Sequence, residues 1–480
     1  MKHFTIGSGL LLALAAACAS VGEDYQAPEL AVPERWHSAE GDELRAGEPE
    51  LAEWWRKLND PELDALIERS ASGSHDLREA FARLREARAL RGDAAGERYP
   101  TLDGKAGFLR RGESDNTPLG SFVPDNGVYS AGFDASWEID LWGRVSRSIE
   151  AANADLDASV ENVRDVSVAV AAETARNYVE LRAFQRRLAI ARDNVSLQEQ
   201  TLELVRGRYE AGLVGERDVA QARTNVESTR SRVPALEVGV AAAEHRLAVL
   251  VGLPPGALAS ELSAERPVPV PPLSVAVGVP AELLRRRADV RRAERELAAA
   301  HARVGVAEGD RLPRLTLAGE LGIAAEDVSD LGESDSGVFG IGPSLRWRLF
   351  DGGRLANRVV AQEARTEQAL VRWERTVLVA LEEAENSMVA FVREQTRRGS
   401  LREAALQARR AVDLSRAQYA EGLSDFQAVI DTERAVAELE DQLATSDAAI
   451  ATHFVALYKA LGGGWEQQPI VAAAVEAARD

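Results

Sequence analysis

The sequence predicts a mixed α and β fold built from two tandem repeats, each with a pair of amphipathic strands and a long helical hairpin. The first observation is the stretch 129–144, where apolar residues alternate with small or acidic residues, as in a strand with one apolar face. The second is that the pattern becomes helical directly afterwards, from Arg144. The third is that the same change recurs at 339–354, so that Trp137 and Trp347 are 210 residues apart.

The amino-acid composition indicates which kinds of molecule the protein is expected to bind. The 480 residues include 57 Lys and Arg against 77 Asp and Glu, which gives a net charge of −20. No basic block stands out, and this argues against a nucleic-acid partner. The acidity fits either a solvated surface or an acidic conduit. Abundant Ala, Arg and Glu with only 5% aromatic residues favour long helices.

The N-terminus has the pattern of a secreted lipoprotein. Residues 1–17 are expected to be a signal peptide, with an apolar core at 10–17 that ends in three alanines. The next residue, Cys18, is the only cysteine and is the expected lipidation site. The alternative is ordinary cleavage after Ala17 with an incidental cysteine. Beyond residue 20, no apolar run has the ~18 residues that a spanning helix needs, so any membrane crossing is expected to use strands.

The first repeat is expected at 61–253, after an extended, lipidated N-terminal segment at 18–60. It is followed by a linker at 254–280 with seven prolines. Pro234 is a possible kink in the return helix. The predicted elements are a short helix near Asp60-Pro61, a helix at 76–97, strands at about 100–110 and 128–140, a helix from Arg144 to about Glu210, and a return helix from about Arg217 to Val251.

The second repeat is expected at 281–464 and has the same order of elements. A weakly patterned C-terminal tail follows at 465–480. The predicted elements are a helix at 289–310, strands at about 313–323 and 338–349, a long helix from Leu355 to the Tyr419–Leu423 turn, and a last helix that ends at Gly462.

The number of predicted strands indicates how many chains would be needed to form a barrel. Four strands of about ten residues are long enough to cross a hydrocarbon layer, but about eight are the fewest that close a barrel. Two chains would supply eight strands around a filled lumen, and three would supply twelve around a hole. The alternative is an ordinary soluble sheet over a core. The long hairpins would form a tube wall when several chains associate, with their turns roughly 100 Å from the strands.

Six motifs stand out along the chain: VGEDYQAP at 21–28, WWRKLNDPEL at 54–63, SWEIDLWGR at 136–144, RYEAGL at 208–213, LFDGGR at 349–354 and QYAEGL at 418–423. Together they resemble the TolC-like outer-membrane factors, specifically the lipoprotein branch that serves tripartite efflux systems. The resemblance implies a homotrimer with a twelve-stranded transmembrane barrel and a periplasmic tunnel of twelve coiled-coil helices, anchored by lipid in the outer membrane. It implies two protein partners, a periplasmic adaptor and an inner-membrane pump of the resistance-nodulation-division type, with no cofactor and no metal.

The resemblance also implies roles for residues near the two turns. Asp218, Tyr419 and Asp431 correspond to gate residues, and an Asp218–Tyr419 hydrogen bond is expected in the closed gate. The family's other acidic ring position is Ala428 here. Alternatives remain for each: an acid in a first helical turn for Asp218, seam packing for Tyr419, a solvated face for Asp431, and plain capping by the turn glycines. The expected adaptor-docking tips are Gly212, Leu213, Gly422, Leu423 and Ser424.

Two other classes of protein fit less well. An enzyme is disfavoured because the chain has no HExxH pair and no Gly-Lys-Ser phosphate loop. A periplasmic adaptor is the second alternative, but it would need one hairpin and β-rich docking domains, whereas the hairpin here is doubled. The cargo stays open, because drug, metal and solvent exporters share this kind of duct.

Overall fold

A computed structural model describes residues 21–29, 31–38, 43–45, 47–112, 114, 116 and 126–465. The predicted signal peptide, Cys18 and the tail from 466 lie outside the described residues. The chain forms two compact units: unit 1 contains 1–29, 85–158 and 293–373, and unit 2 contains 30–84, 159–292 and 374–480. Each unit therefore combines matching parts of both repeats.

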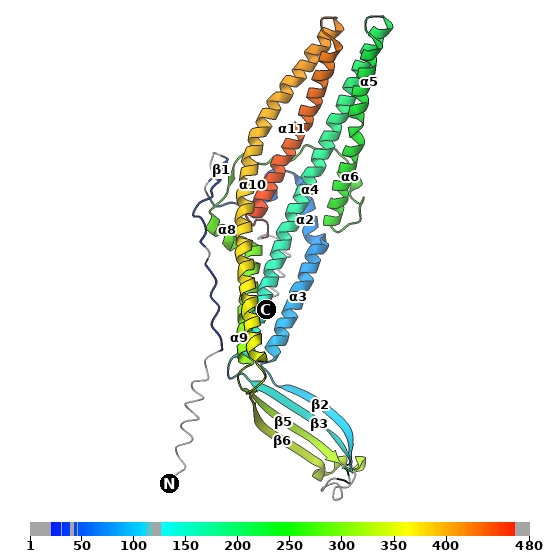
Figure 1. The fold of residues 1–480 in the computed structure, drawn as a ribbon. Helices are drawn as coiled ribbons and strands as arrows, with labels where there is room; N and C mark the ends of the chain where they lie inside the picture. The colour runs from blue at the N-terminus through cyan, green and yellow to red at the C-terminus, as the bar shows by residue number, and fades with distance from the viewer. Residues whose placement is uncertain are drawn as a thin grey trace. The chain divides into compact units, whose positions relative to one another are not determined.

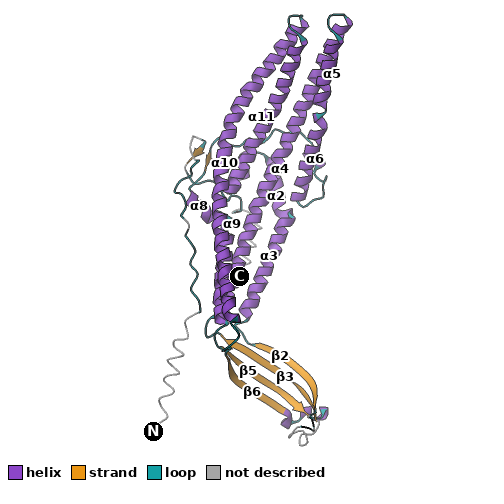
Figure 2. Cartoon of the chain, viewed as in Figure 1, coloured by secondary structure: helices purple, strands orange, loops and turns teal. Residues whose placement is uncertain are grey.

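Unit 1 is built around a four-stranded antiparallel sheet in the order β2-β3-β5-β6 (Figure 2). All four predicted strands are confirmed, but β6 ends three residues earlier than predicted. Its last pair joins Arg346 to Arg314, and the partner strand begins there, after Pro313, so β6 has nothing further to pair with. The strands are β2 (Thr101–Arg111), β3 (Asn126–Ile139), β5 (Arg314–Ala325) and β6 (Gly337–Arg346).

One face of this sheet is apolar and exposed. Phe133 lies opposite Leu321, which in turn lies opposite Phe339, and all three side chains are exposed. On the other face, Lys105 is paired with Asp134 at 2.8 Å. The strands approach closely at Gly132, where a Cβ would lie 2.6 Å from the carbonyl oxygen of Leu321. The predicted alternation is therefore present in three dimensions.

The repeat-related tryptophans make the same contact. Trp137 Nε1 donates to the carbonyl of Arg98 at 2.9 Å, and Trp347 Nε1 donates to that of Arg311 at 3.2 Å. At the start of the first long helix, Asp140 accepts bonds from the backbone N–H groups of Val145 at 3.1 Å and Ser146 at 2.8 Å, which is N-terminal capping. These local bonds turn the chain from strand to helix.

The segment at 21–28 is also bound within unit 1. Arg147 donates to the carbonyls of Val21 at 2.9 Å and Gly22 at 3.0 Å and pairs with Asp24. The hydroxyl of Tyr25 donates to Glu294 at 2.8 Å. This part of the predicted extended segment is therefore held against the helices by specific contacts.

Unit 2 contains the two helical hairpins (Figure 1). The first long helix, α4 (Arg144–Glu210), and its repeat counterpart, α10 (Arg354–Ala420), each have 67 residues and begin in unit 1. The return of the first hairpin is broken into α5 (Glu216–Arg230) and α6 (Arg232–Leu250), whereas that of the second is the continuous α11 (Phe426–Ala460). The break lies just before Pro234, which cannot donate to the carbonyl of Arg230.

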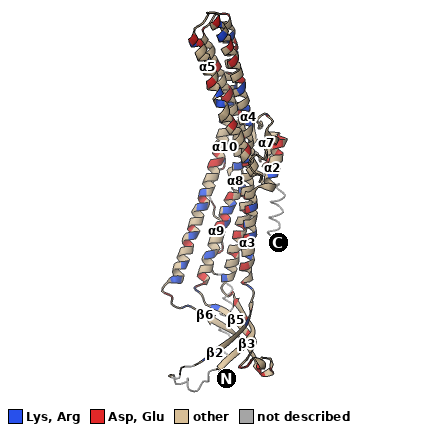
Figure 3. Cartoon of the chain, turned by 90° about the vertical axis from the view of Figure 1, so that its right-hand side faces the viewer, with Lys and Arg blue, Asp and Glu red and all other residues tan. Residues whose placement is uncertain are grey.

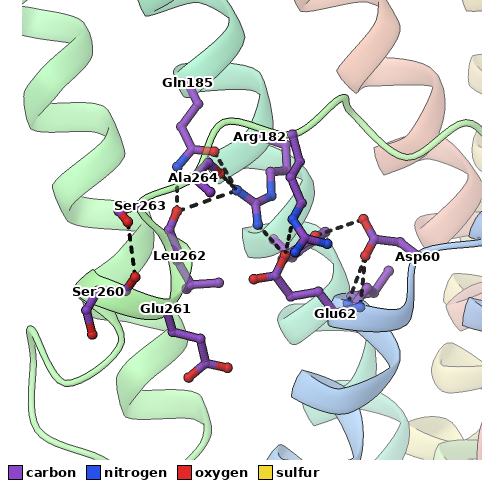
Figure 4. A network of polar contacts seen from close by, with 12 residues as sticks. Asp60, Glu62, Arg182, Gln185, Ser260, Glu261, Leu262, Ser263 and Ala264 are labelled. Carbon is purple, nitrogen blue, oxygen red and sulfur yellow. Dashed lines mark hydrogen bonds and ion pairs between the residues drawn. The ribbon is translucent and has the colours of Figure 1, made fainter.

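The WWRKLNDPEL motif organises the core of unit 2. The first of its two tryptophans, Trp54, stacks on Tyr458 with ring centroids 5.8 Å apart. Asp60 caps α2 (Pro61–Gly73) and accepts the hydroxyl of Tyr178 at 2.8 Å. Arg182 is fully buried and pairs with Glu62 at 2.6 Å, in the network shown in Figure 4. These residues thus stabilise the fold.

The Pro-rich stretch 254–280 is partly structured and contributes buried residues such as Leu258 and Leu262 to this core. None of the described helices has the length and apolarity needed to span a membrane. The remaining elements are β1 (Leu44–Arg45), which pairs with β4 (Val275–Ala276), the 3-10 helices η2 (Trp54–Leu58), η3 (Val328–Gly332) and η4 (Ser334–Ser336), and the helices α3 (His75–Gly96), α7 (Ala259–Leu262), α8 (Pro280–Arg286) and α9 (Ala288–Gly309).

Candidate functional site at the hairpin tips

Both hairpin tips use the same backbone turn. In the first, the N–H of Gly212 bonds the carbonyl of Tyr209 at 2.9 Å and that of Leu213 bonds Arg208 at 2.9 Å. The second turn repeats both bonds at Gly422 and Leu423, and both glycines have positive φ, of 73° and 77°. This is the Schellman motif, in which glycine adopts the left-handed conformation at no steric cost. The expected capping role is therefore present at both tips.

The leucines of the two turns are exposed. Leu213 is 65% exposed and Leu423 is 73% exposed, although the residue at this place in a Schellman motif commonly packs back onto its helix. Ser424 follows in the second turn, and its hydroxyl is buried without a hydrogen-bond partner in the described part of the chain. The tips therefore present two apolar side chains to the surroundings.

Tyr419 is buried, with 2% of its surface exposed, and it packs on Phe426 with ring centroids 5.3 Å apart. The guanidinium of Arg208 lies over its ring at 4.8 Å from the centroid and donates to the carbonyls of Tyr419 at 2.8 Å and Ala420 at 3.0 Å. Because these carbonyls end α10, Arg208 from α4 caps the other hairpin. No local sequence pattern pointed to this role for Arg208.

The predicted Asp218–Tyr419 hydrogen bond is not formed. Among the described residues, the hydroxyl of Tyr419 has no hydrogen-bond partner. Asp218 lies in the first turn of α5, where its closest cation is the adjacent Arg217 at 3.5 Å. Burial raises the pKa of Tyr419, Arg208 lowers it, and the Asp218 carboxylate raises it. Asp218 is therefore near enough to influence the tyrosine electrostatically without bonding to it.

The other predicted gate residue, Asp431, is exposed on α11 and accepts a bond from Gln427 at 2.8 Å. Ala428 lies in the first turn of the same helix, where its N–H bonds Asp425 at 3.0 Å. Figure 3 shows that acidic and basic residues are interspersed along α5. Among the described residues, no hydrogen bond or ion pair joins Asp431 to Asp218 or Tyr419.

A buried polar cluster on the tip side of unit 2 was also missed. Glu433 on α11 is 2% exposed and accepts bonds from Thr201 on α4 at 2.6 Å and Asn225 on α5 at 3.1 Å. Arg416 on α10 pairs with it at 2.9 Å. The sequence contained a signal, because Glu433 lies on the apolar stripe formed by Val429 and Val436, where a charge needs a partner.

The contacts within the cluster are hydrogen bonds and an ion pair between helices. No group of three or more His, Cys, Asp or Glu residues in the described ranges is arranged to hold a metal ion. Around the cluster, an apolar core joins the two hairpins. The arrangement can therefore hold helices together, and its chemistry is that of a structural link.

Comparison with known proteins identifies the family. The family model for outer membrane efflux proteins matches residues 66–253 and 279–463. The chain belongs to this family. Nodulation protein T of Rhizobium leguminosarum bv. trifolii is 31% identical over 461 residues, covering 93% of this chain and 94% of the relative. Pyoverdine export outer membrane protein OpmQ of Pseudomonas aeruginosa is 32% identical over 480 residues, covering 97% and 98%.

A comparison with solved structures supports the same family assignment. The outer-membrane channel OprN has 36% sequence identity and a TM-score of 0.87, over 93% of this chain and 99% of that one. This outer membrane efflux protein is therefore an outer-membrane channel with the TolC-like fold, as the motifs predicted. Members of the family are transport channels, a different class of protein from a periplasmic adaptor.

Proposed function

We propose that three copies of this chain form the exit duct of a tripartite efflux pump, fed by an inner-membrane pump through a periplasmic adaptor. One observation carries the proposal: a four-stranded sheet with an exposed apolar face, in which β2 and β6 are edge strands among the described residues. Open edges are costly in lipid, and four strands are too few to close a barrel. Three copies would supply twelve strands and leave a lumen.

The decisive experiment measures the mass of the assembled complex and so the number of chains in it. The protein is purified from outer membranes, and the mass of the detergent-solubilised particle is measured. We expect three chains, which separate on heating. A monomer would contradict the proposal because the sheet edges would then stay unpaired. The mass of the mature chain tests the proposed lipid on Cys18, and Cys18→Ser is its control.

Paired substitutions on the sheet test which face meets lipid. Ile341 is exposed on the apolar face, and a Cβ added at the adjacent Gly342, which faces the other side, would have open space around it. A lysine on the lipid side costs about 2–4 kcal/mol at the bilayer midplane. Ile341→Lys should therefore reduce the amount of assembled trimer in the outer membrane much more than Gly342→Lys. Equal losses would contradict the assigned faces.

The hairpin tips are proposed as the adaptor-docking end and the gate. The exposed leucines, Leu213 and Leu423, support docking because apolar side chains held out by rigid turns suit a protein partner. Leu213→Asp with Leu423→Asp should abolish adaptor binding in a pull-down while the trimer remains. Trimers that still bind the adaptor would exclude these leucines from the contact.

For the gate, the support is the burial of Tyr419 beside Arg208 and the exposure of Asp431 on the same hairpin. Three copies of Asp431 around a bore would repel each other and attract cations. Asp431→Ala should raise the conductance in planar bilayers and reduce the preference for cations. Unchanged conductance and selectivity would remove Asp431 from the gate.

A further inference from the structure

Glu433 on α11 is bonded to side chains from three other hairpin helices, α4, α5 and α10. Its first oxygen, Oε1, accepts the hydroxyl of Thr201 from α4 at 2.6 Å and the guanidinium of Arg416 from α10 at 2.9 Å. Its second oxygen accepts the amide of Asn225 from α5 at 3.1 Å. Arg416 also donates to the carbonyl of Leu197 on α4. One carboxylate on α11 therefore connects both hairpins through side chains.

The burial of this carboxylate gives the link its strength. A buried charge requires both an opposite charge and hydrogen bonds, because removing a donor leaves a desolvated group unsatisfied. Here the opposite charge, Arg416, belongs to the same hairpin as Glu433, and the two neutral donors belong to the other. Separating the hairpins would strip Glu433 of Thr201 and Asn225, and would strip Arg416 of its bonds to Leu197 and Thr201, while the ion pair itself stays within one hairpin.

The other polar side-chain connections between the hairpins are less buried. Arg434 on α11 is exposed and donates to Asn225 on α5 at 3.2 Å. Arg187 on α4 pairs with Asp441 on α11 at 2.7 Å, but both side chains are about one third exposed, so water screens the pair. Arg208 caps α10 at the tip itself and is bound mainly to backbone. The Glu433 cluster is thus the buried side-chain link between the hairpins.

We propose that Glu433 is a positioning residue of the gate, which holds the two hairpins together and keeps the tip in its closed arrangement. This rests on the proposed function, in which the tips close the duct. Opening by separation of the hairpins then requires Thr201 and Asn225 to release the carboxylate. Glu433 acts from a buried place and does not itself line the bore, which distinguishes it from Asp431.

The test uses the full-length trimer in planar bilayers. Glu433→Gln removes the charge, and Thr201→Val removes one donor with little change of shape. Because a charge-assisted bond is stronger than a neutral one, Glu433→Gln should raise the open probability about tenfold and Thr201→Val less. Thr201→Ser keeps the hydroxyl and should therefore have the same open probability as the wild-type protein. Ion selectivity should be unchanged in all three variants. Loss of a bore-lining charge would change the selectivity, and a merely structural defect would not raise the open probability while leaving the selectivity unchanged.

The matched control is Glu440→Gln. Glu440 lies seven residues further along the same helix and pairs with Arg409, so its ion pair stays within one hairpin. We expect wild-type gating from this control. Assembled Glu433→Gln and Thr201→Val trimers that gate like wild type would overturn the proposal.

Should Glu433→Gln fail to assemble, Thr201→Val against Thr201→Ser decides, because both keep the ion pair. A difference in open probability supports the link, and its absence overturns it. Failure of the proposed function would look different, since the wild-type protein itself would then be monomeric or would form no channels.

Discussion

The two hairpin tips have the same backbone turn but differ in the surroundings of their side chains. Tyr209 and Tyr419 occupy matching places in the repeat, each followed by the same glycine turn. Tyr209 is 45% exposed, whereas Tyr419 is 2% exposed beneath Arg208. The turn is therefore a property of the repeated sequence, and the environment of the tyrosine is a property of the contact between hairpins.

The same contrast appears further along the hairpins. Arg206 and Arg416 are repeat-related, yet Arg206 forms a surface pair with Glu203 within α4, and Arg416 meets the buried Glu433. Pro234 in the first return helix corresponds to Ala444 in the second, which is continuous. The long helices of the two repeats are equal in length, but the ion pair of the buried link belongs to the second hairpin alone.

The largest difference in the free energy of unfolding is expected between alanine variants of Arg416 and Arg206. Arg416→Ala leaves Glu433 as an uncompensated buried charge, which costs about 3–5 kcal/mol. Arg206→Ala removes an exposed pair worth about 0–1 kcal/mol. Urea unfolding of the solubilised protein, followed by helical circular dichroism, measures both. Equal losses would mean that the Glu433 pair is not buried as described.

The two tyrosines come next. Tyr419→Ala leaves a cavity beside Phe426 and should lower the free energy of unfolding by about 3 kcal/mol, as for other buried aromatic side chains. Tyr209→Ala at the exposed position should change it by less than about 0.5 kcal/mol. The same urea titration compares the two variants. A similar loss in both would indicate that Tyr209 is covered in the assembled protein.

A smaller effect is expected at the helix break. Pro234→Ala restores the N–H that can bond the carbonyl of Arg230, so α5 and α6 should join across Ser231, the one residue between them, and the helical signal should grow slightly. Stability should change by about 1 kcal/mol or less. The exposed neighbour variant Ala235→Ser should leave the signal unchanged. An unaltered spectrum in Pro234→Ala would show that packing, and not the proline, breaks the helix.

The smallest effect concerns pH. Burial lowers the pKa of His453 below its usual value of 6.5, while Glu394 opposes the shift. Folding therefore favours the neutral ring, and this stability is present above pH 6.5 and is lost as the pH falls through the lowered pKa. The melting temperature should decline in that window. His453→Ala, which copies Ala243 of the first repeat, should reduce this pH dependence, and an unchanged slope would contradict the assignment.

Much of the fold could be predicted because its signals are local. The alternation around Phe133 predicted a strand with one apolar face, and the proline at 234 marked the helix break within a few residues. The Pro-rich linker was less predictable, since its buried residues Leu258 and Leu262 depend on a core supplied by distant segments. At the tips, sequence pointed to Asp218 and Tyr419 but missed Arg208 and Glu433, whose partners lie on other helices.

By itself, the sequence determined the repeat, the four strands and their faces, the helix lengths and the two glycine turns. Each depends on a period of two or 3.6 residues, or on a backbone angle that glycine adopts freely. Only the tertiary structure decided the strand order β2-β3-β5-β6, which of two equivalent tyrosines is buried, and which acid receives donors from three helices. These outcomes depend on contacts between residues far apart in the chain, and a local pattern contains no information about which surfaces will meet.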